Sequence, residues 1–190
     1  MLAAGVSSRL GSPKQLLTYK GKTLLKHAVD EATNSSTDFI VVVVGANAAA
    51  CINEIDKAKA TVVENKEWEI GMASSLTTGL KTILQQQPFI NGVIFMVCDQ
   101  PFISSVVLNE LIKEHKQTGK PIVASNYGEA IGTPVFFQQS FFPALMQLKG
   151  DEGAKKIIQQ HKDEVATISF PKGEIDIDRK EEYEKLVRTS

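Results

Sequence analysis

The chain has 190 residues, of which 43% are hydrophobic and 23% charged, a balance typical of one soluble globular domain with a sizeable core. Its formal net charge of −1 argues against a nucleic-acid surface, because such surfaces carry an excess of basic residues. Two cysteines provide no disulfide framework and no apolar run is long enough to span a membrane, so we expect a cytoplasmic protein with no nucleic-acid or membrane partner.

Strand-like and helix-like patterns alternate along the chain. Short apolar runs, the longest of β-branched residues at 39–44, predict strands at residues 2–4, 39–44, 61–63, 92–97, 121–124, 134–137, 165–170 and 175–177. Apolar residues at helical spacing predict helices at residues 24–32, 48–58, 74–84, 106–115, 140–148, 152–161 and 179–188. Thr23 and either Ser104 or Ser105 are the expected N-caps of two of these helices.

This alternation predicts a mostly parallel sheet with helices on both faces. Ligands in such sheets bind at the carboxyl ends of the strands. The loop after the first strand and the segment after residue 97 both follow strand ends. We therefore expect these two segments to share one crevice.

The loop at residues 5–14 combines small residues with two cations. Gly5 and Gly11 let the backbone turn its amides toward a ligand, and Arg9 and Lys14 add positive charge. The loop is neither a Walker loop nor a dinucleotide fingerprint, because its glycine spacing fits neither motif. The composition favours a polyphosphate-binding loop; for the loop taken alone, the alternative is a surface turn with two solvated cations.

The string LAAGVSSRLGSPK at residues 2–14 resembles the signature LAAGxSxRxGxxK of the nucleotidyltransferase family that includes the molybdenum cofactor cytidylyltransferases. Later segments match the same family in order: NKEWEIGMASSLTTGL (65–80), VCDQP (97–101), GTPVF (132–136) with GDEGA (150–154), and DIDRKEEY (176–183). The resemblance implies an α/β, three-layer, Rossmann-like, doubly wound fold in a single domain of residues 1–190. Its nucleotide-binding part would lie at about 1–100 and its acceptor-binding part at about 101–190.

The resemblance also implies a reaction. It is the Mg²⁺-dependent transfer of CMP from CTP to the phosphate of the molybdenum cofactor (molybdopterin), with release of pyrophosphate; Mn²⁺ is the alternative ion. The pair Ala3-Ala4 tilts the choice to CTP, because relatives that use GTP more often carry a glycine there. The alternatives are GTP as donor, a sugar phosphate or alcohol phosphate as acceptor, and a non-catalytic chaperone that carries the molybdenum cofactor. An apo-molybdoenzyme or its maturation factor is the implied protein partner.

Three carboxylates are candidate metal ligands. Asp99 directly follows an apolar run, which places it at a strand end, and Mg²⁺ prefers one or two carboxylates with phosphate oxygens. Asp176 and Asp178 would share a face if they lie on a strand. The resemblance implies a metal role for Asp99 and Asp178, with Asp176 as a further candidate. For Asp178 the alternative is a cap of the terminal helix.

The remaining site residues rest on the resemblance. It implies that Arg9, Lys14 and Asp99 are catalytic, with the two cations neutralising the triphosphate. The implied nucleotide-binding residues are Leu2, Ala3, Ala4, Gly5, Ser7, Ser8, Arg9, Lys14, Asn65, Gly71, Ser74 and Ser75. The implied acceptor-binding residues are Gln100, Gly132, Pro134, Asp151 and Gly153. Helix capping is the alternative for Ser74, turn chemistry is the alternative for the acceptor segments, and Trp68 either lines the crevice or covers the core.

Overall fold

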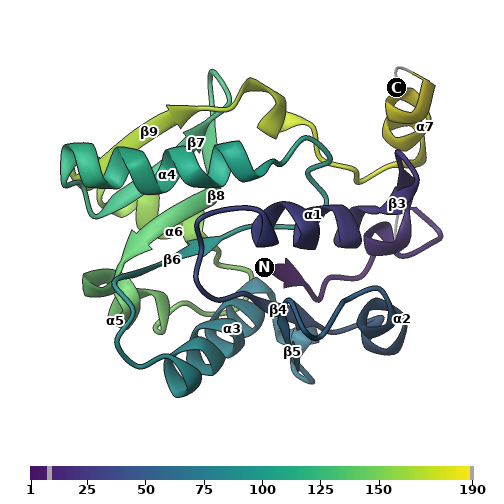
Figure 1. Ribbon diagram of the computed structural model, residues 1–190, viewed down its shortest axis with the longest axis horizontal. Helices are drawn as coiled ribbons and strands as arrows, with labels where there is room; N and C mark the ends of the chain where they lie inside the picture. The colour runs from purple at the N-terminus through teal and green to yellow at the C-terminus, as the bar shows by residue number, and fades with distance from the viewer. Residues whose placement is uncertain (8–9, 189–190) are drawn as a thin grey trace.

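A central sheet runs through the computed structural model, which describes residues 1–7 and 10–188 (Figure 1). One half of the sheet has the order β1-β4-β5, made of β1 (Leu2–Ala3), β4 (Val41–Val44) and β5 (Thr61–Glu64). The other half has the order β6-β8-β7-β9, made of β6 (Gly92–Phe95), β7 (Ile122–Asn126), β8 (Ile131–Gln138) and β9 (Val165–Ser169). A parallel bridge between Leu2 and Val97 joins the two halves, so β1 lies at the centre.

The sheet is mostly parallel, as the alternating pattern predicts. β1, β4 and β5 run parallel to one another, and so do β7 and β9. β8 runs antiparallel to both β6 and β7. β7 and β8 are joined by only residues 127–130, and a connection that short can join only antiparallel neighbours.

Helices cover both faces of the sheet, which makes the predicted three-layer, doubly wound fold (Figure 1). One face carries α1 (Leu24–Thr33), α2 (Ala48–Asn53) and α4 (Ser105–Thr118). The other carries α3 (Met72–Gln86), α5 (Phe142–Leu145) and α6 (Ala154–Gln160). The valines of β4 alternate between the two cores, Val42 and Val44 on the α1 side and Val41 and Val43 on the α3 side. This explains why β4 is an unbroken apolar run.

Two predicted helix caps are confirmed. The Thr23 hydroxyl accepts a hydrogen bond from the Lys26 amide (3.1 Å) and caps α1. Ser104, rather than Ser105, caps α4, because its hydroxyl accepts from the Val107 amide (3.4 Å). The chain ends with α7 (Lys180–Arg188), which lies beside the hairpin of β2 (Thr18–Tyr19) and β3 (Lys22–Thr23) in Figure 1.

Several predicted elements differ from the structure in extent or kind. The strand predicted at 134–137 is longer, because β8 begins at Ile131 and ends at Gln138. The helix predicted at 48–58 ends at Asn53, because the Asp56 side chain accepts from the Ala58 amide and forms a turn instead. The helix predicted at 140–148 is divided between η3 (Gln139–Phe141) and α5. Residues 175–177 form no strand; they follow η5 (Pro171–Glu174) as an irregular segment. The remaining 3₁₀ helices are η1 (Lys14–Leu16), η2 (Trp68–Ile70) and η4 (Lys162–Glu164).

Among the described residues, no helix has the length and the apolar character needed to span a bilayer.

Candidate active site

A cavity of about 360 Å³ opens at the carboxyl end of β1. It lies where the loop after β1 meets the segment after β6, so the predicted shared crevice is present. Four parts of the chain form its wall: β1 with its loop and η1, the turn from η2 into α3, the segment after β6, and the loop before α6. The predicted site residues among its lining are Leu2, Ala3, Ala4, Gly5, Lys14, Gly71, Ser75, Asp99 and Asp151.

A lysine and two carboxylates meet at the edge of this cavity. Lys14 Nζ lies 2.5 Å from Asp99 Oδ2 and 2.8 Å from Asp178 Oδ1. Partial burial by itself lowers the pKa of Lys14, but the two carboxylates outweigh it and hold this pKa above its usual value. Lys14 is therefore a permanent cation that joins residues 85 and 164 positions away in the chain.

The segment at 176–178 reaches this centre without being a strand. The Ile177 amide donates to the Asp99 carbonyl (3.1 Å), and the Ile177 side chain is fully buried among Tyr19, Leu24 and Leu186. This anchoring brings Asp178 to Lys14. Partial burial and the charges of Asp178 and Asp99 raise the pKa of Asp176, although the residue as a whole is exposed. A metal contact of Asp176 stays a prediction.

The carboxylates fit a divalent cation that is completed by phosphate oxygens. Asp99 Oδ1 is buried and has no hydrogen-bond partner among the described residues. The described part of the chain offers no group of three or more His, Cys, Asp or Glu side chains suited to hold a metal ion alone. Mg²⁺ is commonly held by one or two carboxylates plus substrate phosphates and water. Asp99 and Asp178 are the residues that could hold such an ion.

Residues at the end of the loop after β1 form hydrogen bonds to its beginning. Ser7 Oγ accepts a hydrogen bond from the Lys14 amide (2.8 Å). The buried Gln15 donates from Nε2 to the carbonyls of Ala3 (3.1 Å) and Gly5 (2.8 Å). Gln15 was not predicted from the sequence, although its position next to Lys14 is the signal that could have identified it. The predicted residues Ser8 and Arg9 lie outside the described residues.

Asn65 organises the start of α3. Its Nδ2 donates to Ser74 Oγ (2.8 Å) and Ser75 Oγ (2.9 Å), and its Oδ1 accepts from the Glu67 amide (3.0 Å). Both side-chain donors of Asn65 are therefore used within the fold, and a nucleotide contact of Asn65 stays a prediction. The Ser74 hydroxyl lies within donating distance of the carbonyls of Glu67 (2.9 Å) and Gly71 (2.8 Å). The alternative that Ser74 caps α3 is wrong, because Gly71 is the N-cap and no side chain among the described residues accepts from the first amides of the helix.

Gly71 permits a close approach of two loops. Its φ of 123° is a conformation that side chains rarely adopt, and a Cβ there would overlap the Gly150 carbonyl and lie 2.7 Å from Asp151 Oδ1. The Gly150 carbonyl also accepts from the Ala73 amide (3.0 Å) at the start of α3. The loop of residues 150–153 is thus held against the cavity at β1, and Gly153 packs on Met72 nearby.

The predicted acceptor residues fall into two groups. Asp151 and Gly153 lie beside the start of α3, whereas Gln100 and Gly132 lie close to Tyr127, and Pro134 follows Thr133, whose carbonyl is near both Gln100 and Tyr127. The buried Gln100 Nε2 is within hydrogen-bond distance of Tyr127 Oη (3.2 Å) and of the carbonyls of Thr133 (3.1 Å) and Gly173 (2.7 Å). Gly132 leaves room for the Tyr127 hydroxyl, and Pro134 is buried behind it. Of these five residues only Asp151 lines the cavity.

Trp68 has both of the roles that the sequence left open. It lines the cavity and also packs against the core cluster of Ala4, Val41 and Val43. Val6 and Met72 line the same cavity and are 58% and 48% exposed, so its mouth has an apolar rim that sequence patterns did not reveal.

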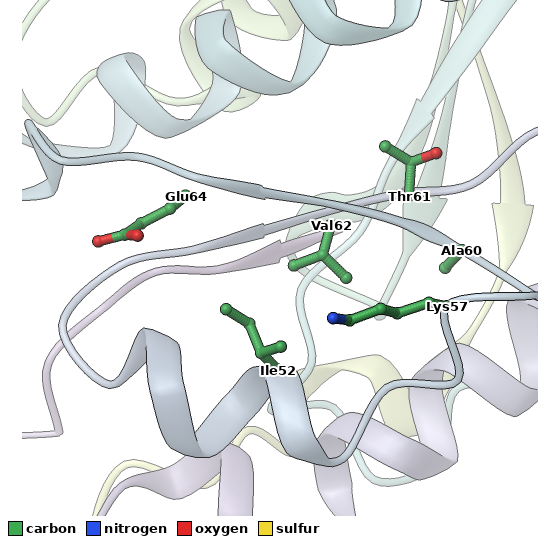
Figure 2. A pocket seen from close by; sticks show the side chains of 6 residues that line it. All are labelled: Ile52, Lys57, Ala60, Thr61, Val62 and Glu64. Carbon is green, nitrogen blue, oxygen red and sulfur yellow. The ribbon is translucent and has the colours of Figure 1, made fainter.

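A second cavity, of about 380 Å³, lies away from these residues, between α2 and the edge strand β5. Figure 2 shows its lining, with Glu64 toward one end and the Lys57 side chain extending between Val62 and Ile52. It contains none of the predicted site residues.

The chain is similar to known proteins over most of its length. Residues 1–165 match the family model described as "MobA-like NTP transferase domain". Nicotine blue oxidoreductase of Paenarthrobacter nicotinovorans is 29% identical over 167 residues, covering 84% of this chain and 80% of the relative. Purine catabolism protein PucB of Bacillus subtilis (strain 168) is 27% identical over 198 residues, covering 98% and 94%. The crystal structure of Rv0371C in complex with manganese, from Mycobacterium tuberculosis H37Rv, has a TM-score of 0.81 at 26% identity, covering 100% of this chain and 96% of that one.

Proposed function

This chain belongs to the MobA-like NTP transferase domain family and is a nucleotidyltransferase, and we propose that it transfers CMP from CTP to the phosphate of the molybdenum cofactor and releases pyrophosphate. The observation that carries the proposal is the contact of Lys14 with Asp99 and Asp178 beside the cavity at β1. A cation and two carboxylates at the carboxyl end of a central strand are the groups that a metal-bound triphosphate needs.

The cavity supports a small-molecule donor. Its volume of about 360 Å³ falls within the usual range for ligand sites. Its floor is the backbone of Ala3 and Ala4, both buried and both small, so a base can approach the main chain closely. The resemblance of this pair to relatives that use CTP supports cytosine as the base. GTP is the alternative donor, and the test below distinguishes the two.

The metal assignment follows from the same residues. Asp99 and Asp178 would hold Mg²⁺, with Mn²⁺ as the alternative ion; the manganese complex of the mycobacterial relative supports a divalent metal. When bound, the ion would neutralise charge on the phosphate oxygens and polarise the reacting phosphoryl group.

The reaction requires positioning more than proton transfer. The acceptor phosphate is largely ionised near neutral pH, because its second pKa is about 6. One of its oxygens attacks the α-phosphorus of CTP, and the bond from that phosphorus to the bridging oxygen breaks with both electrons, releasing pyrophosphate. Lys14, and Arg9 as predicted from sequence, would stabilise the negative charge that develops on the leaving group. No general base is needed for this step.

The direct test is pyrophosphate release by the purified chain with Mg²⁺ and molybdenum cofactor, comparing CTP with GTP. We expect release with CTP and little with GTP. Release with GTP alone would overturn the choice of base, and release with neither, from folded protein that binds nucleotide, would overturn the choice of acceptor. Asp99→Asn is the matched control, because it keeps the side-chain shape and removes the charge that Lys14 contacts.

A further inference from the structure

The metal site proposed above already contains a cation that belongs to the protein. Lys14 Nζ bridges Asp99 Oδ2 and Asp178 Oδ1 at 2.5 and 2.8 Å, and these are the same two carboxylates that would hold the metal. We infer that Lys14 occupies the metal site in the ligand-free protein, and that a divalent ion enters only when a triphosphate draws Lys14 away. This inference rests on the proposed assignment of Asp99 and Asp178 as metal ligands.

Charge and burial support an exchange rather than joint occupancy. An ammonium in direct contact with both carboxylates repels an incoming divalent cation strongly, because the side chains are only partly exposed and screening there is weak. The Lys14, Asp99 and Asp178 side chains are 19%, 13% and 37% exposed. Lys14 therefore has to leave before a metal can take both carboxylates.

Lys14 cannot leave without a new partner. Its side chain is mostly buried, and moving it off the two carboxylates without another anion would leave a desolvated charge uncompensated. A triphosphate in the adjoining cavity provides that anion. Lys14 lines the cavity as well as touching both carboxylates, so its long flexible side chain can reach either position.

The backbone of Lys14 does not need to move in this exchange. Its amide is held by Ser7 Oγ at 2.8 Å, and its neighbour Gln15 is fixed by two backbone carbonyls. Only the side-chain torsions of Lys14 have to change. By thermodynamic linkage, if the triphosphate raises the affinity for metal by some factor, the metal raises the affinity for triphosphate by the same factor.

The exchange predicts that removing the ammonium improves metal binding while it harms catalysis. The test measures Mn²⁺ binding to the full chain without nucleotide, by the electron paramagnetic resonance signal of free Mn²⁺. We expect Lys14→Met to bind Mn²⁺ about tenfold or more tightly than the wild type. Lys14→Arg, which keeps the positive charge, should bind as weakly as the wild type. Lys81→Met, a change of an exposed lysine on α3, should have no effect.

A second arm locates the effect. Lys14→Met combined with Asp99→Asn should lose the gain in Mn²⁺ affinity, and thermal melting of each variant confirms that it is folded. If Lys14→Met binds Mn²⁺ no better than the wild type, the inference is overturned; if it fails to fold, Lys14→Gln takes its place in the same comparison. A gain in Mn²⁺ affinity for Lys14→Met, together with no transfer to molybdenum cofactor by the wild type, would sustain the exchange and overturn only the proposed acceptor.

Discussion

Gly71 offers a direct test of how the cavity at the carboxyl end of β1 is built. It adopts φ 123° and ψ 179° and faces the carbonyl of Gly150, so an added Cβ meets backbone rather than a flexible side chain. Strain of this backbone conformation costs about 1–3 kcal/mol for a residue other than glycine. Displacing the loop at Gly150 adds about 1–3 kcal/mol. We therefore expect Gly71→Ala to lower the free energy of unfolding by about 4 kcal/mol.

For a chain of this size, each kcal/mol corresponds to about 2–4 °C in melting temperature, so Gly71→Ala should lower Tm by about 12 °C in calorimetry. Gly119→Ala is the matched control. Gly119 also has a positive φ, 68°, but an added Cβ meets nothing within 4 Å, so we expect a loss of only about 1 kcal/mol, or about 3 °C. Equal melting temperatures for the two variants would refute the close approach of Gly71 and Gly150.

Three further predictions concern catalysis, the acceptor side and the thiols. Asp99→Asn should lower turnover by on the order of 10²-fold or more while the folded state persists, which steady-state pyrophosphate release and circular dichroism together would show. Gln100→Leu should raise KM for the acceptor more than KM for the nucleotide, because it removes a donor that ties the Thr133 and Gly173 carbonyls to the Asp99 loop; equal changes in both constants would contradict this. Burial raises the pKa of Cys51 from 9.0 to about 11, so the folded state keeps its proton where the unfolded state loses it, and the stability from this group falls between pH 9 and 11. Urea unfolding at pH 8 and pH 10 should show this fall, and Cys51→Ala should reduce it.

The layers of the fold could be predicted because each strand and helix carries its own local pattern. The valine run of β4 is apolar on both faces, as a strand buried on both sides requires. Thr23 and Ser104 are N-cap residues that indicate where α1 and α4 begin. The β2–β3 hairpin was missed because its strands have two residues each and its signal is only the turn at Lys20 and Gly21, both with positive φ.

The segment at 175–177 shows where periodicity misleads. An apolar residue between two aspartates imitates the alternation of a strand, but no neighbouring strand pairs with it. It is held by the burial of Ile177 and by hydrogen bonds from the Ile177 amide to the Asp99 carbonyl and from the Ile175 amide to the Lys172 carbonyl. Asp178 does reach Lys14, but it does so because Ile177 is anchored beside it and not because the segment is a strand.

The sequence identified Lys14, Asp99 and Asp178 as site residues, but it did not predict that they contact one another. Lys14, Asp99 and Asp178 each follow from a motif, yet their direct pairing depends on β1 lying beside the segment after β6. Gln15 and Asn65 show a second limit of prediction from sequence. A polar residue near a motif can either bind a ligand or support the backbone, and the sequence does not distinguish these roles. Here Gln15 supports the β1 loop and Asn65 supports the start of α3.

The most direct test of the proposed reaction follows the nucleotide rather than the leaving group. With CTP labelled at the α-phosphate, Mg²⁺ and molybdenum cofactor, the label should appear on the cofactor in step with pyrophosphate release, and Asp99→Asn should suppress both. Pyrophosphate release without label on the cofactor, or label transfer that Asp99→Asn leaves unchanged, would contradict cytidylyl transfer at the Lys14–Asp99–Asp178 centre.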